Sequence, residues 1–275
     1  MPHEVVAPSG RIVACLLLVA CAGCDSGNDP ADSTSDLDLA GELDHGTELD
    51  TSAEVDTSGP GTTYGQVYEG GEFHLGPVDW EESAWHNACA PGDGYAAAIR
   101  ELEGELLAGL WNGIPEVAGL CDACIFVTTE RGKSALLRVV TYGDTSTNSI
   151  DVSPAAFALL DSGEYPRLMR WQLAECPDTG AIVYEFQTGS SEWWTSLWVR
   201  NARVPLERVE VMSPNHANFV ALERGSDGTL TDAAGFGAGE FTLRLTGVDG
   251  RVVSDTFAWP AGGIAGATLS GSQFE

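Results

Sequence analysis

The stretch from residue 189 to residue 201, GSSEWWTSLWVRN, constrains the fold of this 275-residue chain more than any other segment. It holds three of the eight tryptophans among residues that favour strands, and it predicts one strand of an all-β domain. Side chains of a strand alternate between two faces, so Trp194 and Trp198 are expected on one face and Trp193 on the other. At least one indole is then expected at the surface, unless all three fill the core of a sandwich.

An exposed indole indicates a binding surface, because a flat, rigid aromatic ring loses little entropy on binding and suits the C–H groups of a sugar ring. Charge narrows the choice of ligand. The chain has a formal net charge of −28, and residues 62–275 alone hold 29 acidic against 12 basic residues. Such a surface repels nucleic acids, anionic membranes and acidic wall polymers. A neutral polysaccharide is therefore the expected partner, and nucleic acid is not.

The N-terminus has the pattern of an export signal. Arg11 precedes an apolar run over residues 12–20, which is too short to span a bilayer but suits the core of a signal peptide. The run ends in Leu-Val-Ala followed by Cys21, as in bacterial lipoproteins, so we expect residues 1–24 to form a signal and anchor region with Cys21 lipidated. Cys24 is the alternative anchor, and an ordinary cleaved signal is a third interpretation. The expected location is the outer membrane or cell surface, with the lipid as the only membrane contact.

Residues 25–61 have the composition of a tether. They contain eleven Asp or Glu residues and no Lys or Arg, and their apolar residues follow no helical or strand period. Dense negative charge extends such a segment by self-repulsion. We expect a disordered linker, which would hold the folded part tens of ångströms from the membrane at about 3 Å per residue.

Residues 182–204, which contain the tryptophan-rich stretch, resemble the Y-R-x-K-E-G-S-S-x-W-W-x-x-x-Q-V-R-N-H-x-x-P segment of bacterial expansins. The resemblance implies that residues 177–275 form an immunoglobulin-like sandwich of carbohydrate-binding module family 63. Trp193 and Trp194 would then lie on a flat cellulose-binding surface.

Two positions of this second domain depart from the family pattern. His216 stands where the family has a third platform aromatic, and Gln187 stands where it has a basic residue. We expect His216 to be exposed and to offer less stacking area than tyrosine. We expect Gln187 to bind the polymer without the charge of a lysine.

Four earlier segments resemble the first domain of the same family. They are GTTYG at 61–65, GGEF at 70–73, LCDACIFVT at 120–128 and SIDVSPAAF at 149–157. Together they imply a six-stranded double-psi β-barrel over residues 62–176. The expected fold is therefore all-β, with this barrel followed by the sandwich.

Four cysteines fall in the expected barrel, namely Cys89, Cys121, Cys124 and Cys176. An exported chain is expected to oxidise them. The resemblance implies that Cys89 pairs with Cys121 and Cys124 with Cys176. The Cys121-x-x-Cys124 spacing also suits zinc or redox chemistry, but zinc requires a second ligand pair and none is obvious in the sequence. We expect no metal and no cofactor.

Asp151 is the expected centre of any chemistry in the barrel. The resemblance implies that it lies in an open groove and is required for wall loosening, with Thr62 hydrogen-bonding nearby. The family usually has V-T-D-x-Y upstream, whereas the sequence VTYGD here puts Tyr142 in the aspartate position and offers Asp144 as the substitute. From the residues alone, Asp151 can instead be interpreted as the N-cap of a helix that starts near Pro154.

Hydrolysis of a glycoside ordinarily needs two carboxyl groups, and only Asp151 matches the family pattern. We therefore expect a monomeric, non-hydrolytic protein that binds cellulose or a related neutral glucan of a cell wall and disrupts non-covalent contacts between chains. One alternative is a peptidoglycan lytic transglycosylase resembling rare lipoprotein A, which shares the barrel, the lipobox and a catalytic aspartate. The other is a purely polysaccharide-binding lipoprotein with an inert barrel.

Overall fold

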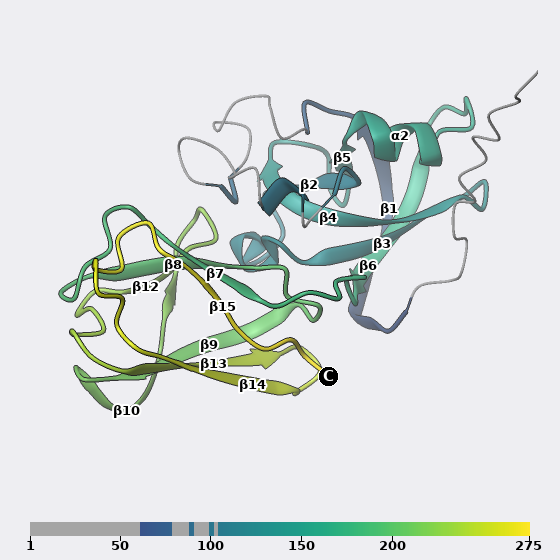
Figure 1. The fold of residues 1–275 in the computed structure, drawn as a ribbon. Coiled ribbons are helices and arrows are strands. Elements are labelled where there is room, and N and C mark those ends of the chain that lie inside the picture. The colour runs from purple at the N-terminus through teal and green to yellow at the C-terminus, as the bar shows by residue number, and fades with distance from the viewer. Residues whose placement is uncertain (1–60, 79–87, 91–98, 102–103) are drawn as a thin grey trace, which may run out of the picture. The chain divides into compact units, whose positions relative to one another are not determined.

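The computed structural model of the protein describes residues 61–78, 88–90, 99–101 and 104–275. The expected signal region at 1–24, with Cys21 and Cys24, and the expected linker up to residue 60 lie outside the described residues. The described part consists mostly of β-strands, which form one closed barrel and two further sheets (Figure 1). None of its helices is both long and apolar enough to cross a membrane.

Six strands close the barrel in the order β1-β5-β2-β4-β3-β6. Their bounds are β1 (Thr63–Leu75), β2 (Leu107–Trp111), β3 (Cys124–Thr129), β4 (Ser134–Gly143), β5 (Ile150–Val152) and β6 (Leu168–Ala174), with the 3-10 helix η1 (Val117–Leu120) and the α-helix α2 (Pro154–Leu160) between strands. β1 pairs with β5 and β2 pairs with β4 in parallel, whereas the other neighbours are antiparallel. The predicted double-psi β-barrel is confirmed.

Alternate side chains of these strands fill the barrel. They include Phe73, Ile125, Leu137, Ile150 and Trp171, each at most 1% exposed. Trp171 stacks on Tyr68 with ring centroids 4.0 Å apart, and its indole N–H donates to the carbonyl of Asn148. The one polar atom of this large ring is therefore satisfied, and the barrel has an apolar core of its own.

The N-cap of helix α2 is Ser153 and not Asp151. The Ser153 hydroxyl accepts a hydrogen bond from the backbone N–H of Ala156, and Pro154 occupies the first turn, where its missing N–H costs nothing. The interpretation of Asp151 as the helix N-cap is therefore wrong.

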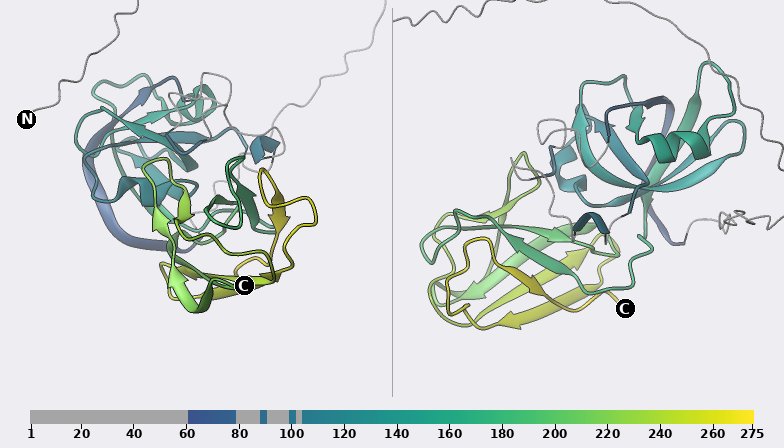
Figure 2. Two further views of the ribbon diagram at one scale, coloured as in Figure 1. Left: turned by 90° about the vertical axis from the view of Figure 1, so that its left-hand side faces the viewer. Right: turned by 45° about the horizontal axis from the view of Figure 1, so that its top comes forward.

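Nine strands form the other two sheets, in the orders β10-β9-β13-β14 and β11-β12-β8-β7-β15. Their bounds are β7 (Val183–Phe186), β8 (Thr195–Arg200), β9 (Leu206–Ser213), β10 (His216–Ala221), β11 (Glu223–Arg224), β12 (Leu230–Asp232), β13 (Phe241–Gly247), β14 (Val252–Phe257) and β15 (Thr268–Ser270). Both sheets contribute to one apolar core that is rich in phenylalanine. Figure 2 shows these two sheets face to face, which confirms the predicted sandwich.

The strand predicted over residues 189–201 is shorter than expected. β8 covers Thr195–Arg200, and the residues before it form turns that a single bridge between Ser191 and Trp194 closes. The alternation of faces therefore starts only at Thr195, and it does not govern the orientation of the two adjacent tryptophans.

All six residues of β8 are buried because each face of the strand is covered by a different part of the protein. Leu197 and Val199 pack into the sandwich core. On the opposite face, the indole N–H of Trp198 donates to the carbonyl of Asp227, and Arg200 reaches the barrel.

Arg200 joins the sandwich to the barrel, and both belong to one compact unit. Its fully buried guanidinium lies 2.6 Å from the carboxylate of Asp122, which is located between η1 and β3. It also donates to the carbonyl of Cys89 and to the carboxylate of Glu185, at 3.0 Å each. A buried charge is tolerated only when charged partners and hydrogen bonds surround it, so these contacts hold the junction in one arrangement.

Two further contacts strengthen this junction. Arg138 of β4 donates to both carboxylate oxygens of Asp178, at 2.6 and 2.7 Å, and to the carbonyl of Asp122. Gly228 of the sandwich lies against Cys121, and a Cβ atom at position 228 would be 2.7 Å from the Cys121 Cβ. Only glycine fits there, because its φ of +74° also disfavours other residues.

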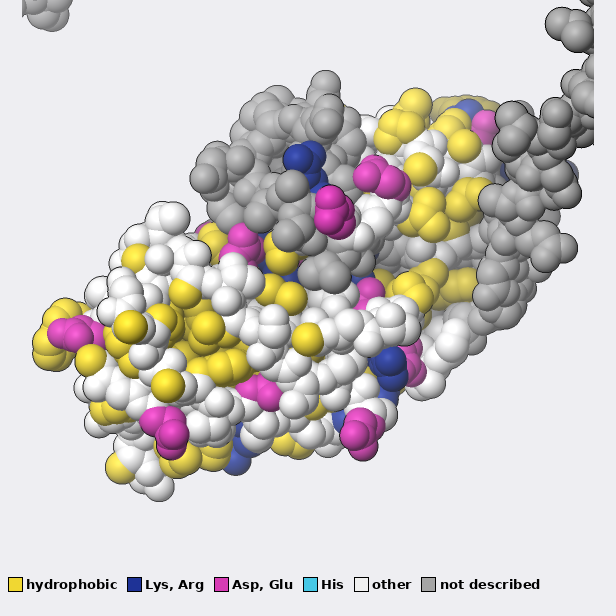
Figure 3. All heavy atoms as spheres, in the orientation of Figure 1, with side chains coloured by type: hydrophobic (Ala, Val, Ile, Leu, Met, Phe, Trp, Pro, Cys, Tyr) yellow, Lys and Arg dark blue, Asp and Glu magenta, His cyan; other side chains and the backbone are white. Residues whose placement is uncertain are grey.

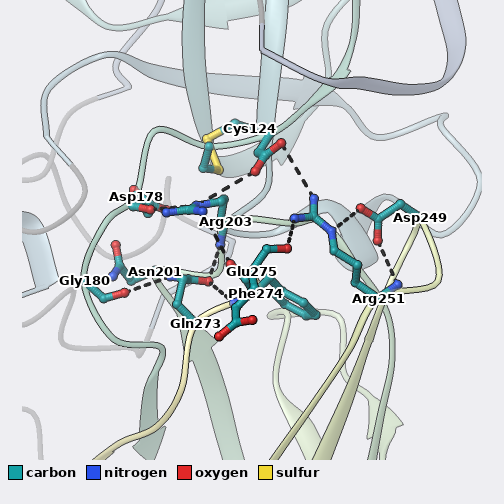
Figure 4. A network of polar contacts seen from close by, with 12 residues as sticks. Cys124, Asp178, Gly180, Asn201, Arg203, Asp249, Arg251, Gln273, Phe274 and Glu275 are labelled. Atoms are coloured by element: carbon teal, nitrogen blue, oxygen red, sulfur yellow. Dashed lines mark hydrogen bonds and ion pairs between the residues drawn. A yellow bond between two sulfur atoms is a disulfide. The ribbon is translucent and has the colours of Figure 1, made fainter.

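The C-terminal residues are held by a separate polar network (Figure 4). The side chain of Gln273 bonds to backbone groups of Gly180, Asn201 and Arg203. Arg251 donates to the carbonyl of Glu275 at 2.7 Å and to the hydroxyl of Tyr64 on β1 at 3.0 Å. The chain end is thereby tied to the sandwich and to the barrel.

The described part of the chain contains two disulfides, Cys89–Cys121 and Cys124–Cys176. This is the pairing that the resemblance implied. The zinc or redox interpretation of Cys121 and Cys124 is wrong, because each sulfur is bonded to a different, distant cysteine. Within the described ranges, no group of three or more His, Cys, Asp or Glu side chains is arranged to hold a metal ion.

The junction leads to a test of stability. Arg200→Ala should lower the free energy of unfolding by roughly 3–5 kcal/mol, because it leaves Asp122 buried without its partner. The matched control is Arg208→Ala, since the Arg208 side chain is 55% exposed and should contribute less than about 0.5 kcal/mol. Urea unfolding of both variants measures the difference. Equal stabilities of the two variants would show that the buried ion pair does not hold the junction.

Candidate functional site

Trp193 and Trp194 lie at the tip of the hairpin formed by β7 and β8. Their side chains are 71% and 36% exposed, whereas Trp198, four residues later, is 3% exposed. The prediction of at least one exposed indole is confirmed, and the alternative in which all three tryptophans fill a core is wrong. Two adjacent exposed indoles offer a large apolar surface at one place.

Hydrogen bonds fix the turn that carries this tryptophan pair. The Ser190 hydroxyl donates to the carbonyl of Ser196 at 2.8 Å and accepts from its N–H at 3.1 Å. The carbonyl of Glu192 accepts from the N–H of Gly237 at 2.9 Å and from the side-chain amide of Asn215 at 3.4 Å. A turn that is already ordered costs little entropy when a ligand binds.

His216 lies close to this turn, because its neighbour Asn215 bonds to Glu192. The His216 ring nitrogen is 2.6 Å from the carboxylate of Asp232, and the two side chains are 18% and 9% exposed. The expectation of an exposed His216 is therefore wrong. Replacing it with tyrosine would leave Asp232 without this partner, so the exchange is not a neutral change on the surface.

Gln187 directly follows β7, at the start of the loop that carries the tryptophan pair. Its backbone N–H donates to the carbonyl of Ser196 at 2.9 Å, and its carbonyl accepts from the N–H of Gly266 at 3.1 Å. The backbone of Gln187 thus closes the hairpin below the two tryptophans.

On the outer face of the barrel, four residues of neighbouring strands form a row in the order His74, Asp151, Gly109 and Thr141. The register of β1 with β5 places His74 beside Asp151, and the register of β5 with β2 places Gly109 on its other side. Gly109 in turn pairs with Thr141 of β4. Because Ile150 points into the barrel core, Asp151 must point outward.

Two glycines allow close packing around Asp151. A Cβ atom at Gly76 would lie 2.5 Å from the Asp151 Cβ, and one at Gly109 would lie 2.8 Å from the methyl group of Thr141. Both distances are too short for real contacts, so any larger residue would displace its neighbours. The carboxylate is half-buried in this row, and partial burial raises the pKa of Asp151, while the nearby His74 lowers it to a smaller extent.

Thr62 lies at the opposite end of β1 from Asp151. Its neighbour Thr63 pairs with Ala174 of β6, whereas Asp151 lies beside His74, near the other end of the strand. The carbonyl of Thr62 accepts from the N–H of Glu175, and no hydrogen bond joins Thr62 to Asp151 in the described part of the chain.

Tyr142 and Asp144 contact other groups than Asp151. The hydroxyl of Tyr142 donates to the carbonyl of Ser226 in the sandwich. Burial raises the pKa of Tyr142, and the carboxylate of Asp227 raises it further. Asp144 is exposed and accepts a hydrogen bond from the side-chain amide of Asn112. Tyr142 therefore contributes to the junction between barrel and sandwich.

His74 is the residue that the sequence analysis missed. The alternation of Glu72, Phe73 and His74 indicates that His74 points out of the barrel, but the pairing with β5 brings it beside Asp151. That pairing joins residues 77 positions apart, and no local signal marks it.

No protein-family model matches the chain. Among curated proteins, it is 26% identical over 196 residues to Expansin-YoaJ of Bacillus subtilis, with 71% of this chain and 75% of that protein covered. The chain is thus similar to expansins. This expansin-like protein is also 28% identical over 78 residues to Expansin-like protein 6 of Dictyostelium discoideum, covering 28% of the chain and 27% of that protein. For Expansin-like protein 3 of the same organism, the identity is 22% over 156 residues, covering 54% and 46%.

Solved structures agree with this assignment at the level of the fold. The apo form of an expansin from Clavibacter michiganensis superposes with a TM-score of 0.59 at 19% identity, covering 76% of this chain and 98% of that one. A single-residue variant of the same expansin, solved in complex with cellohexaose, gives the same values. The expansin-like protein therefore shares the barrel and sandwich architecture of that molecule.

The burial of Asp151 leads to a test by pH. A carboxyl whose pKa is raised on folding contributes stability in acid that is lost as the pH rises through the folded pKa. The asparagine side chain of Asp151→Asn does not titrate. The melting temperature of the variant minus that of the wild type should therefore be more positive at pH 7 than at pH 3. A change of about 2–4 °C in this difference would correspond to about 1 kcal/mol of unfolding free energy in a protein of this size.

The control for this test has the opposite sign. A hydrogen bond from Arg167 lowers the pKa of Asp161, so that carboxylate contributes stability at neutral pH that acid removes. Asp161→Asn should therefore reduce stability at pH 7 and change it little at pH 3. If both variants respond to pH alike, the burial of Asp151 is not the cause.

Proposed function

We propose that this expansin-like protein binds cellulose or a related neutral glucan and loosens non-covalent contacts between polysaccharide chains without hydrolysing them. The single observation that carries the proposal is the exposed tryptophan pair, Trp193 and Trp194, on a turn ordered by hydrogen bonds. Stacking on the apolar faces of sugar rings is the binding mode that such a pair favours. The cellohexaose bound to the structurally similar Clavibacter variant supports the same class of ligand.

The surface supports a neutral polymer as the ligand. On the face seen in Figure 3, the described side chains are mostly uncharged, with isolated acidic and basic groups between them. The formal net charge of −28 opposes binding to nucleic acids and to anionic wall polymers. An uncharged glucan meets no such repulsion.

The surroundings of Asp151 support a mechanism without hydrolysis. The described residues on either side of Asp151 in the strand register are His74 and Gly109, and neither carries a second carboxylate. An acid and a base or nucleophile normally flank a glycosidic bond that is hydrolysed. We infer that Asp151 instead hydrogen-bonds to sugar hydroxyls and competes with contacts between polymer chains.

The protein is proposed to act outside the cytoplasm as a monomer. The disulfides Cys89–Cys121 and Cys124–Cys176 favour an oxidising compartment. We propose that residues 1–24 direct export, that Cys21 or Cys24 carries a lipid anchor, and that the acidic segment 25–61 is the tether to the barrel (62–176) and sandwich (177–275).

The tryptophan pair leads to a direct binding test. The double variant Trp193→Ala with Trp194→Ala should bind cellulose with an affinity reduced by about tens-fold, since each stacked ring contributes on the order of 1 kcal/mol or more. Its melting temperature should stay close to that of the wild type, because the side chains are exposed. A pull-down on microcrystalline cellulose with a thermal melt of the same samples gives both values.

The matched control is Trp171→Ala in the barrel core, where the side chain is 1% exposed. Truncating such a side chain costs roughly 3–5 kcal/mol, so this variant should melt early. Unchanged cellulose binding by the double variant would remove the tryptophan pair from the proposed site.

Asp151 leads to a test that separates the candidate activities. Asp151→Asn should abolish the weakening of cellulose paper while leaving cellulose binding within about twofold, because the tryptophan pair is intact. Chromatography of the wild-type supernatants should show no new reducing ends. Anhydro-muropeptides released from peptidoglycan would favour the lytic transglycosylase, and binding without any weakening of paper would favour a binding protein with an inert barrel.

A further inference from the structure

His74 and Asp151 lie side by side on the outer face of the barrel. They are paired residues of the parallel strands β1 and β5. Residues paired in this way point to the same side of the sheet and lie about 5 Å apart, the spacing of neighbouring strands. Both side chains are half-buried, so each keeps part of its surface accessible from this side of the barrel.

Neither side chain has a hydrogen-bond partner among the residues that the structure describes. Polar groups that are partly withdrawn from water normally bind a protein group, a water molecule or a ligand. The imidazole and the carboxylate therefore remain available to a ligand that meets this outer face of the barrel.

The two groups have complementary hydrogen-bonding chemistry. An ionised carboxylate only accepts hydrogen bonds, whereas an imidazole donates from at least one ring nitrogen. A sugar hydroxyl both donates and accepts. A ring with two neighbouring hydroxyls can therefore donate one hydrogen bond to Asp151 and accept another from His74, whereas a lone carboxylate offers only an acceptor.

Among the described residues, two polar side chains on neighbouring positions are already engaged in hydrogen bonds. Glu72, on the same strand and the same face as His74, accepts from the backbone N–H of Arg167. The hydroxyl of Thr141 accepts from a backbone N–H at 3.1 Å. Within the described residues, His74 is the charged group that acts on Asp151.

We propose that His74 is the second polar residue of the barrel site, and that His74 and Asp151 together hold neighbouring hydroxyls of one glucan chain. The inference rests on the proposed function for the identity of the ligand. It assigns His74 a direct role in sugar binding, beside the carboxylate that the motifs indicate.

The pairing itself is tested without any sugar. Carboxyl ¹³C NMR of the full chain gives the pKa of Asp151 in the wild type and in His74→Gln. An imidazolium next to the carboxylate favours its ionised form, so removing it should raise the pKa of Asp151. His216→Gln is the matched control and should leave that pKa unchanged, because His216 pairs with Asp232 in the sandwich. An Asp151 pKa that does not respond to His74→Gln would overturn the pair.

The role in sugar binding is tested with two substitutions at His74. His74→Leu removes the donor, and should reduce the weakening of cellulose paper about fivefold to tenfold, the effect expected for losing one hydrogen bond. His74→Gln keeps a donor and should restore part of the activity. Both variants should keep the wild-type melting temperature and bind cellulose within about twofold of the wild type, through Trp193 and Trp194. Full activity of His74→Leu would overturn the proposal.

The two proposals fail in different ways. A wild type that neither binds cellulose nor weakens paper would refute the proposed function, and with it glucan as the ligand of this pair. Normal wild-type activity together with an active His74→Leu would refute only the role of His74. A His74→Leu variant that loses activity and also unfolds at lower temperature, with His74→Gln equally inactive, would assign His74 to the structure of the barrel and overturn its role in binding.

Discussion

The buried ion pair between Arg200 and Asp122 is the interaction on which the arrangement of the protein depends. Asp122 adopts a left-handed backbone conformation, with φ of 64°, and this lets its carboxylate meet Arg200 while its carbonyl accepts from Arg138. It also lies between Cys121 and Cys124, each of which is bonded to a distant cysteine of the chain. The disulfides hold the residue that receives both arginines, and the arginines compensate for the burial of charge at this place.

The strand β8 connects this junction to the tryptophan pair. Arg200 ends the strand at the barrel, and Trp194 immediately precedes its first residue, Thr195. Since both faces of β8 are buried, the strand cannot shift or rotate without breaking the sandwich core or the ion pair. The turn that carries the tryptophan pair is therefore held in a fixed position relative to the anchor at Arg200.

Much of the fold could be predicted from the sequence, because local patterns indicate strands and the motifs that resemble expansins imply the architecture and the cysteine pairing. The exceptions have physical causes. The tryptophan pair was assigned to a strand, but hydrogen bonds from Ser190 to Ser196 bend the chain into a turn before β8 starts. His216 was expected in water, but it pairs with Asp232, which lies in register with Thr195 of β8. The position of His74 beside Asp151 depends on a parallel pairing between distant strands, which leaves no trace in a short window of sequence.

In the binding site proposed above, the turn that carries Trp193 and Trp194 separates the choice of ligand from the stability of the fold. Its shape is set by Ser190, Asn215 and Gly237 through bonds to backbone atoms, and none of these bonds involves an indole. The two aromatic side chains can therefore be exchanged during evolution without rebuilding the sheet beneath them. A lineage that meets a new polymer can alter its preference at these two positions while the rest of the sandwich stays under unchanged selection.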